Sequence, residues 1–165
     1  MSGQGEMAYF YEYMWGLADR RDLRKAIDGG IVQYRFTLPL NTLVEVTCHD
    51  LDPSFACLVQ SEPWAAPLNA LDHQNFLRAI LKGNRSALHL ISAGVVEDVK
   101  NPAVYRLCWF VPRGQGPDNQ WYEGLLEFDK LYKAFDKVLG GSSSKNNPGM
   151  QANTFAQGQY QIFMP

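Results

Sequence analysis

The sequence predicts a single α+β domain in which a five-stranded antiparallel sheet packs against three helices, in the chain order α-βββ-α-ββ-α. Three observations lead to this prediction. Apolar residues recur every three or four positions in three segments, as on one face of a helix. In five shorter segments they alternate with polar residues or run almost unbroken, as in strands. Turn-forming Gly, Pro, Asn and Asp separate these segments.

The first helix is expected over residues 7–27. Its apolar stripe comprises Met7, Phe10, Tyr11, Met14, Leu17 and Ala18. The stripe shifts near Asp19, which indicates either a kink or the start of a second helix. Asp28–Gly30 ends the segment, because paired glycines are poor helix formers.

Three strands are expected next, as a meander. Residues 31–38 and 43–49 alternate apolar with polar side chains, and residues 55–61 form a shorter apolar run. The turns between them fall at Pro39–Asn41 and Asp50–Pro53, which hold typical turn residues. The meander then leads through two prolines to the central helix.

The central helix is expected to start at Asn69 and to stop at Gly83–Asn84. Two strands follow, over residues 87–96 and 105–111. Both are apolar on each face, which predicts a sheet that is covered on both sides.

The last helix is expected over residues 120–141. Its apolar stripe holds Trp121, Leu125, Phe128, Tyr132, Phe135 and Leu139, and the opposite side carries Glu and Lys. Gly140–Gly141 is expected to end it. Such a helix buries one face against a sheet.

The 165 residues are 46% hydrophobic and 13% aromatic, which is enough apolar material for one core. We assign that core to residues 1–139 and treat residues 140–165, which begin with Gly, Ser and Asn, as a flexible extension. The net charge of −2 without a run of Lys or Arg argues against nucleic acid as the main partner. No basic and apolar leader or long apolar span is visible, so we expect a cytoplasmic protein that does not insert into a membrane.

The residues that could support catalysis fit simpler explanations. Cys48 and His49 are adjacent on a predicted strand, so they point to opposite faces and do not form a nucleophile and base pair. Cys48, Cys57 and Cys108 lie in predicted strands without a CxxC motif, which fits buried reduced thiols. His73 and His89 have no second ligand at metal-motif spacing. We therefore expect no metal site.

Two further patterns also fit explanations other than catalysis. Asp50 and Asp52 precede a proline, where turn chemistry accounts for both carboxylates. Gly114 and Gly116 loosely match a phosphate-binding loop, but prolines flank them and the Lys–Ser/Thr pair is missing. The sequence thus predicts no enzyme and no cofactor.

Surplus apolar surface is the feature that remains, and it typically marks a protein interface. The central helix and the strand after it carry more apolar faces than one side of a sheet can cover. We therefore predict a homodimer joined through these two segments. The predicted interface comprises Phe76, Leu77, Ile80, Leu81, Leu88, Leu90, Val95 and Val96.

This order of elements resembles that of the class I type III secretion chaperones, the Tir-chaperone family of bacterial pathogens. The resemblance covers about residues 7–139. It rests on Pro67–Leu68 before Asp72, on Phe76–Leu77 and Asn84, on the strand over 87–96, and on the closing helix over 121–139. This family has no catalytic signature, so the resemblance is one of pattern.

The resemblance implies a non-enzymatic cytosolic chaperone of a bacterium, homodimeric and without a cofactor. Such a protein contributes to virulence by holding the N-terminal region of a secreted effector in extended form and delivering it to the secretion ATPase. The implied cargo-binding residues are Met7, Phe10, Tyr11, Met14, Val32, Tyr34 and Phe36. Family members are commonly shorter, so the extension over 140–165 is a departure that could cover a cargo groove, lengthen it or dock on a partner.

Two alternatives belong to other classes of protein. The sheet and the last helix could enclose an apolar cavity in a small ligand-binding or enzymatic domain. The chain could also be an adaptor or immunity protein whose partner is a toxin. A copurifying polypeptide or small molecule would separate these alternatives.

Overall fold

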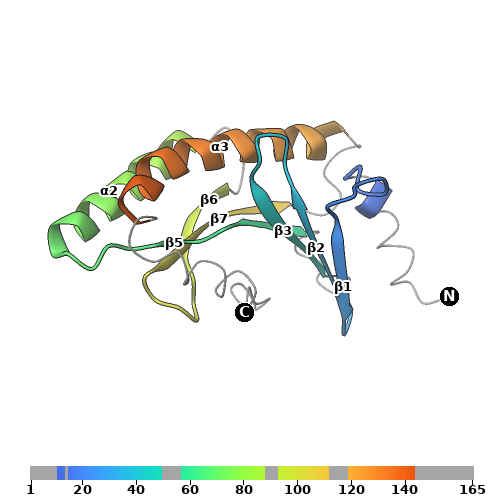
Figure 1. Cartoon of the computed structure of the whole chain (residues 1–165), viewed down its shortest axis with the longest axis horizontal. Coiled ribbons are helices and arrows are strands. Elements are labelled where there is room, and N and C mark those ends of the chain that lie inside the picture. Colours follow the sequence, from blue (N-terminus) through green and yellow to red (C-terminus); the bar gives the residue numbers. More distant parts are fainter. Residues whose placement is uncertain (1–10, 14, 50–56, 88–92, 112–118, 144–165) are drawn as a thin grey trace.

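The computed structural model describes residues 11–13, 15–49, 57–87, 93–111 and 119–143, and these form an α+β domain (Figure 1). Residues 11–13 are helical. The strands are β1 (Arg24–Asp28), β2 (Ile31–Thr37), β3 (Leu43–His49), β4 (Cys57–Ser61), β5 (Trp64–Ala65), β6 (Ala93–Glu97) and β7 (Val104–Val111). The two long helices are α2 (Ala70–Ser86) and α3 (Asn119–Ser143). The predicted fold class and the antiparallel sheet are therefore confirmed.

The strands form one sheet of seven strands, and every described pair is antiparallel. β1, β2, β3 and β4 follow one another across the sheet, and β4 and β5 both pair with the same side of β7. β6 lies on the other side of β7, because Cys108 stands opposite both Gln60 and Gly94. Among the described strands, β1 and β6 thus lie at the two sides of the sheet, and the two-residue β5 pairs with β7 alone.

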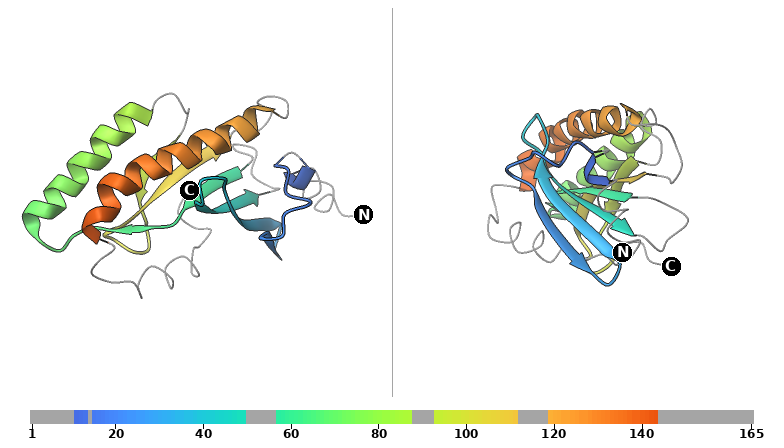
Figure 2. Two further views of the ribbon diagram at one scale, coloured as in Figure 1. Left: turned by 45° about the horizontal axis from the view of Figure 1, so that its top comes forward. Right: turned by 90° about the vertical axis from the view of Figure 1, so that its right-hand side faces the viewer.

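Both long helices cover the same face of the sheet, where they lie side by side (Figure 2). The large apolar side chains of the sheet point towards them and form the core with α3. The opposite face carries most of the polar side chains of the sheet together with Leu58, Cys108 and Phe110, and several of its polar side chains are buried. These are Gln33, Glu45, Thr47, Gln60 and Arg106.

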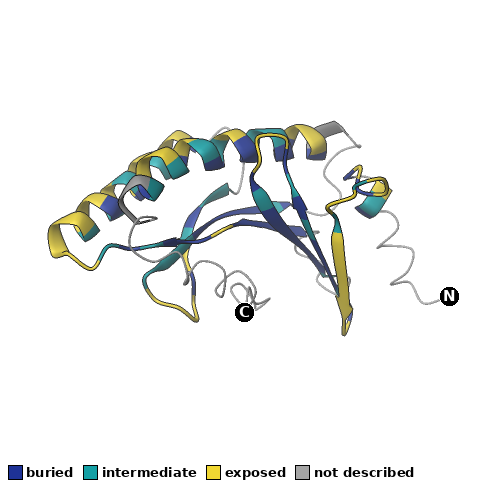
Figure 3. Cartoon of the chain, viewed as in Figure 1, coloured by how far each residue is buried: buried dark blue, intermediate teal, exposed yellow. Residues whose placement is uncertain are grey.

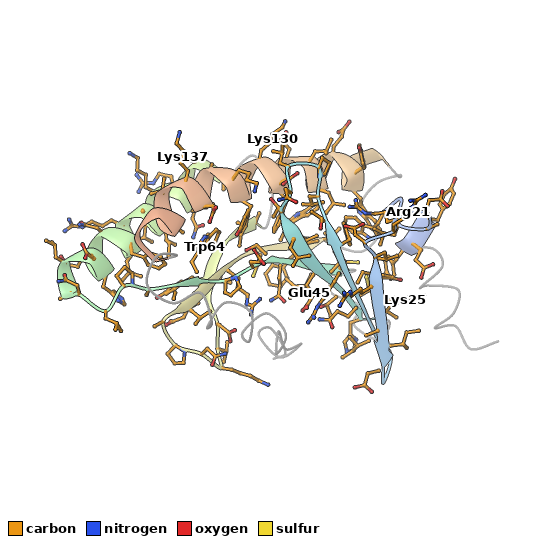
Figure 4. The ribbon with its side chains drawn as sticks, viewed as in Figure 1. Arg21, Lys25, Glu45, Trp64, Lys130 and Lys137 are labelled. Atoms are coloured by element: carbon orange, nitrogen blue, oxygen red, sulfur yellow. The ribbon has the colours of Figure 1, made fainter. Side chains whose placement is uncertain are left out.

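The apolar stripe predicted for α3 is confirmed, since all six of its residues are buried. Trp64 of β5 stacks on Tyr132 with ring centroids 5.0 Å apart, while Lys130 and Lys137 point away from the sheet (Figure 4). At Gly124 an added Cβ would lie 2.1 Å from the Trp109 ring. The glycine therefore allows α3 to lie directly on β7.

The expected first helix does not reach residue 27, because residues 24–28 form β1 instead. Gly29 and Gly30 have φ of 52° and 86°, which fits a tight type I′ turn that joins β1 to β2. The change of hydrophobic period near Asp19 is the sequence signal of this change of structure. β1 and β5 are two strands that the sequence did not predict.

The ends of both long helices also differ from the prediction. Asn69 caps α2 as expected, its Oδ1 accepting from the backbone N–H of Leu71 at 2.9 Å. However, α2 continues through Gly83–Asn84 to Ser86, and α3 continues beyond Gly140–Gly141 to Ser143. Gly83 lies inside α2, and a Cβ there would lie 2.2 Å from the Phe135 ring, so the glycine allows α2 to pack closely against α3 and does not end the helix.

Candidate functional site

The residues predicted to bind cargo lie inside the core wherever they are described. Tyr11, Val32, Tyr34 and Phe36 are each 1% exposed or less. Tyr11 stacks on Trp121 of α3 with ring centroids 6.0 Å apart. Met7, Phe10 and Met14 lie outside the described residues. In the single chain these four side chains are not accessible to a partner, and their role in cargo binding stays a prediction.

The residues predicted for the dimer divide into two groups. Phe76, Ile80 and Val95 are buried, and Phe76 packs edge-on against Tyr105 at 5.3 Å. Leu77 and Val96 are partly exposed, and Leu81 is 69% exposed. Leu88 and Leu90 lie outside the described residues. The solvent-facing members therefore come from the outer side of α2 and from β6.

The outer edge of β6 is sealed by a side chain from α2. Asn84 Nδ2 donates to the carbonyl oxygen of Val95 at 3.0 Å, and Asn84 Oδ1 accepts from the Val95 N–H at 2.7 Å. Gly94 permits this approach, because an added Cβ would lie 3.2 Å from Asn84 Oδ1. The amide thus takes the place of a neighbouring strand at Val95 and protects the edge from further pairing.

The outer edge of β1 is open by comparison. In a two-residue hairpin the pair beside the turn, here Asp28 and Ile31, exchanges both backbone hydrogen bonds. Alternation then directs the N–H and C=O groups of Lys25 and Ile27 outwards. All five residues of β1 are exposed, and no other described strand pairs with its outer edge (Figure 3). β1 therefore offers unpaired backbone groups to an incoming strand.

Charged side chains of both signs lie on and near this open edge. Arg24 and Lys25 lie on β1, and Arg20 and Arg21 precede it (Figure 4). Lys25 forms an ion pair with Glu12, and Arg20 bonds to Asp22 at 3.0 Å. Charges on an edge strand discourage indiscriminate strand pairing. The outer edge of β1 can thus accept another strand, and its charged side chains favour partners of suitable charge.

A charged cluster crosses the polar face of the sheet. Arg35 Nε lies 2.8 Å from Glu45 Oε2, and Arg106 Nε lies 3.8 Å from Asp98 Oδ2. Burial raises the pKa of the Glu45 carboxyl, and Arg35 acts in the opposite direction. Arg106 also donates to the carbonyl oxygen of Ser61 at 3.4 Å, so it links β7 to β4. The sequence analysis did not predict this cluster, although Arg35, Glu45 and Arg106 occupy strand positions that alternate with core residues.

The catalytic candidates stay apart in the structure. Cys48 lies in the core, and the alternation along β3 places His49 on the other face. His73 Nδ1 lies 3.2 Å from the carbonyl oxygen of Pro67 at the start of α2. His89, Asp50, Asp52, Gly114 and Gly116 lie outside the described residues. Among the residues that the structure describes, no three His, Cys, Asp or Glu side chains gather in a metal-binding arrangement.

No protein-family model, curated protein or solved structure matches this chain. Within its described part, neither helix combines the length and the apolar character needed to cross a membrane. The features that bear on function are therefore the two edges of the sheet and the outer side of α2.

Proposed function

We propose that this chain is a protein-binding domain and not an enzyme, and that it receives an extended segment of a partner protein at the outer edge of β1. The observation that carries this proposal is the outward direction of the Lys25 and Ile27 backbone groups on an exposed strand. A strand added there would pair with these groups. Ile27 and Tyr13, which are 62% and 71% exposed, supply apolar contacts near the edge.

The proposed partner is the N-terminal region of a secreted effector, held for delivery to the ATPase of a type III secretion system in the bacterial cytoplasm. This part of the proposal rests on the family resemblance. The succession of β2, β3, β4, α2, β6, β7 and α3 supports it, since it follows the order on which the resemblance depends. The predicted cargo residues on β2 lie on the strand that pairs with β1, so these residues and the proposed binding edge belong to the same side of the sheet.

The proposed homodimer joins two copies through the outer side of α2. Leu71 and Leu81 are 66% and 69% exposed, and Leu77 on the same helix is partly exposed. Because Asn84 occupies the β6 edge at Val95, the two copies would meet through these side chains and not through a continuous sheet. Replacing Leu81 with Glu should then shift sedimentation at micromolar concentration from dimer to monomer.

The test of partner binding uses two variants at one position. Ile27→Pro removes the outward N–H while leaving the pairing of β1 with β2 in place, and Ile27→Ala removes the side chain but keeps the N–H. Coexpression with neighbouring genes, followed by purification, should yield a bound polypeptide. We expect Ile27→Pro to weaken its binding about tenfold, about 1.4 kcal/mol, and Ile27→Ala to weaken it less.

Each result has a defined meaning. If a folded Ile27→Pro variant binds the polypeptide as the parent does, the β1 edge is not the binding site. A copurifying toxin would indicate an adaptor or immunity protein, and a bound small molecule would indicate a ligand-binding domain. Thermal unfolding of both variants establishes that each is folded.

A further inference from the structure

Cys48 and Cys57 are direct neighbours across strands β3 and β4. The register pairs these two residues, and their Sγ atoms lie 2.8 Å apart. Both side chains are fully buried on the face that α3 covers. Directly opposed residues of antiparallel strands have Cα atoms about 4.5–5.5 Å apart, within the range of about 4.4–6.8 Å that disulfides span. The sulfurs can therefore bond without displacement of either strand.

We propose that Cys48 and Cys57 form an oxidisable thiol pair that a low-molecular-weight disulfide converts into an intramolecular disulfide. The thiolate of one cysteine attacks a sulfur of the oxidant, and one oxidant thiol leaves. The thiolate of the other cysteine then attacks the protein sulfur of this mixed disulfide, and the second oxidant thiol leaves. The protein thiols lose two protons and two electrons, and the oxidant disulfide gains them as it becomes two thiols.

Both thiols are fully buried, so the oxidant reaches them only when the structure around them opens locally. Such local openings do not require unfolding of the whole domain.

Cys108 provides an internal reference. It alternates on β7 with Leu107 and Trp109, which belong to the core, so its side chain lies on the opposite face of the sheet. Its neighbours across the strands are Gln60 and Gly94, not another cysteine. Burial raises the pKa of its thiol to about 12, which lowers the fraction of reactive thiolate at neutral pH.

The test treats the full chain with oxidised glutathione and counts the remaining thiols after unfolding in urea. With three cysteines, of which two become linked, the parent should keep one thiol and the Cys108→Ala variant none. Peptide mass spectrometry should identify a bond between Cys48 and Cys57. The melting temperature should rise by about 5 °C and return to its first value in dithiothreitol.

Two alanine variants and a positive control define which results would contradict the proposal. Cys48→Ala and Cys57→Ala should form no intramolecular disulfide, and Val138→Cys, at a position on α3 that is 63% exposed and lies outside the proposed dimer interface, should show that the oxidant modifies an exposed thiol. The proposal fails if the parent keeps three thiols while the introduced thiol of that control reacts, if Cys108 is part of the bond, or if each cysteine carries glutathione. Mapping of the parent chain alone decides the question if an alanine variant does not fold.

Discussion

The strands at the two sides of the sheet, β1 and β6, differ in how their unpaired edges are treated. At β6, the Asn84 amide bonds to both backbone groups of Val95. At β1, the outward groups of Lys25 and Ile27 meet no other described strand, and every residue of the strand is exposed. A hydrogen-bonded side chain closes the edge of β6 at Val95, whereas the edge of β1 carries charged side chains and pairs with no further described strand.

This difference shows that an edge strand can be protected in two ways with different consequences for binding. A side chain that satisfies the backbone groups removes the reason for another strand to pair there. Charged side chains oppose most partners but leave the backbone groups available to a partner of suitable sequence. The comparison therefore favours β1 over β6 as the edge that accepts an extended chain.

The largest effect on this comparison is expected from Asn84→Ala. The variant leaves the N–H and C=O of Val95 without their partners, and it should lower the free energy of unfolding by about 2 kcal/mol. It should also make β6 an open edge, so self-association should increase with concentration. Urea unfolding and sedimentation measure the two effects. Asn75→Ala, an exposed change on the same helix, is the control, and equal stability of the two variants would contradict the role given to Asn84.

A smaller effect is expected from Gly83→Ala, which alters the position of the helix that carries Asn84. The new methyl group would lie within 2.2 Å of Phe135, so α2 must move away from α3 or the ring must turn. Overpacking costs about 1–3 kcal/mol, and the better helix propensity of alanine returns about 1 kcal/mol. Thermal unfolding should therefore show a modest net loss of stability. Adding Phe135→Leu in the same chain should remove the clash. The explanation is refuted if the double variant loses more free energy of unfolding than the two single variants lose together.

The smallest effect is expected from Glu45→Gln, in the middle of the sheet and away from both edges. Burial raises the pKa of Glu45 above 4.5, so as pH rises the carboxyl of the unfolded chain ionises first, and this favours unfolding. The parent should lose this contribution to stability as the pH rises above 4.5, and the glutamine variant should not. The melting temperature of Glu45→Gln relative to the parent should therefore increase with pH. A difference that is constant or falls over this range would show that Arg35 dominates over burial.

Measuring partner binding by Glu45→Gln separates binding at the strand edges from binding at the polar face of the sheet. The change leaves the backbone of β1 and the amide of Asn84 untouched, so binding at either edge should equal that of the parent. Reduced binding by this variant would indicate that the polar face, and not an edge, contacts the partner.

The sequence by itself determined the elements whose cause is local. The stripe from Trp121 to Leu139 predicted α3, the alternation over 31–38 and 43–49 predicted β2 and β3, and Asn69 predicted the start of α2. Periodicity and capping act within a few turns or residues, so they are readable without knowledge of the fold. The placement of Cys48 and His49 on opposite faces followed from the same local rule.

Tertiary structure decided everything that depends on a distant partner. Residues 24–28 form a strand because β2 pairs with them across the Gly29–Gly30 turn, and Gly83 lets α2 pack closely against Phe135 of α3. Asn84, which reads as a helix stop, bonds to a strand eleven residues later. The sequence could not show which strand edges are open or which cysteines meet, because strand order brings together residues whose separation along the chain carries no periodic signal.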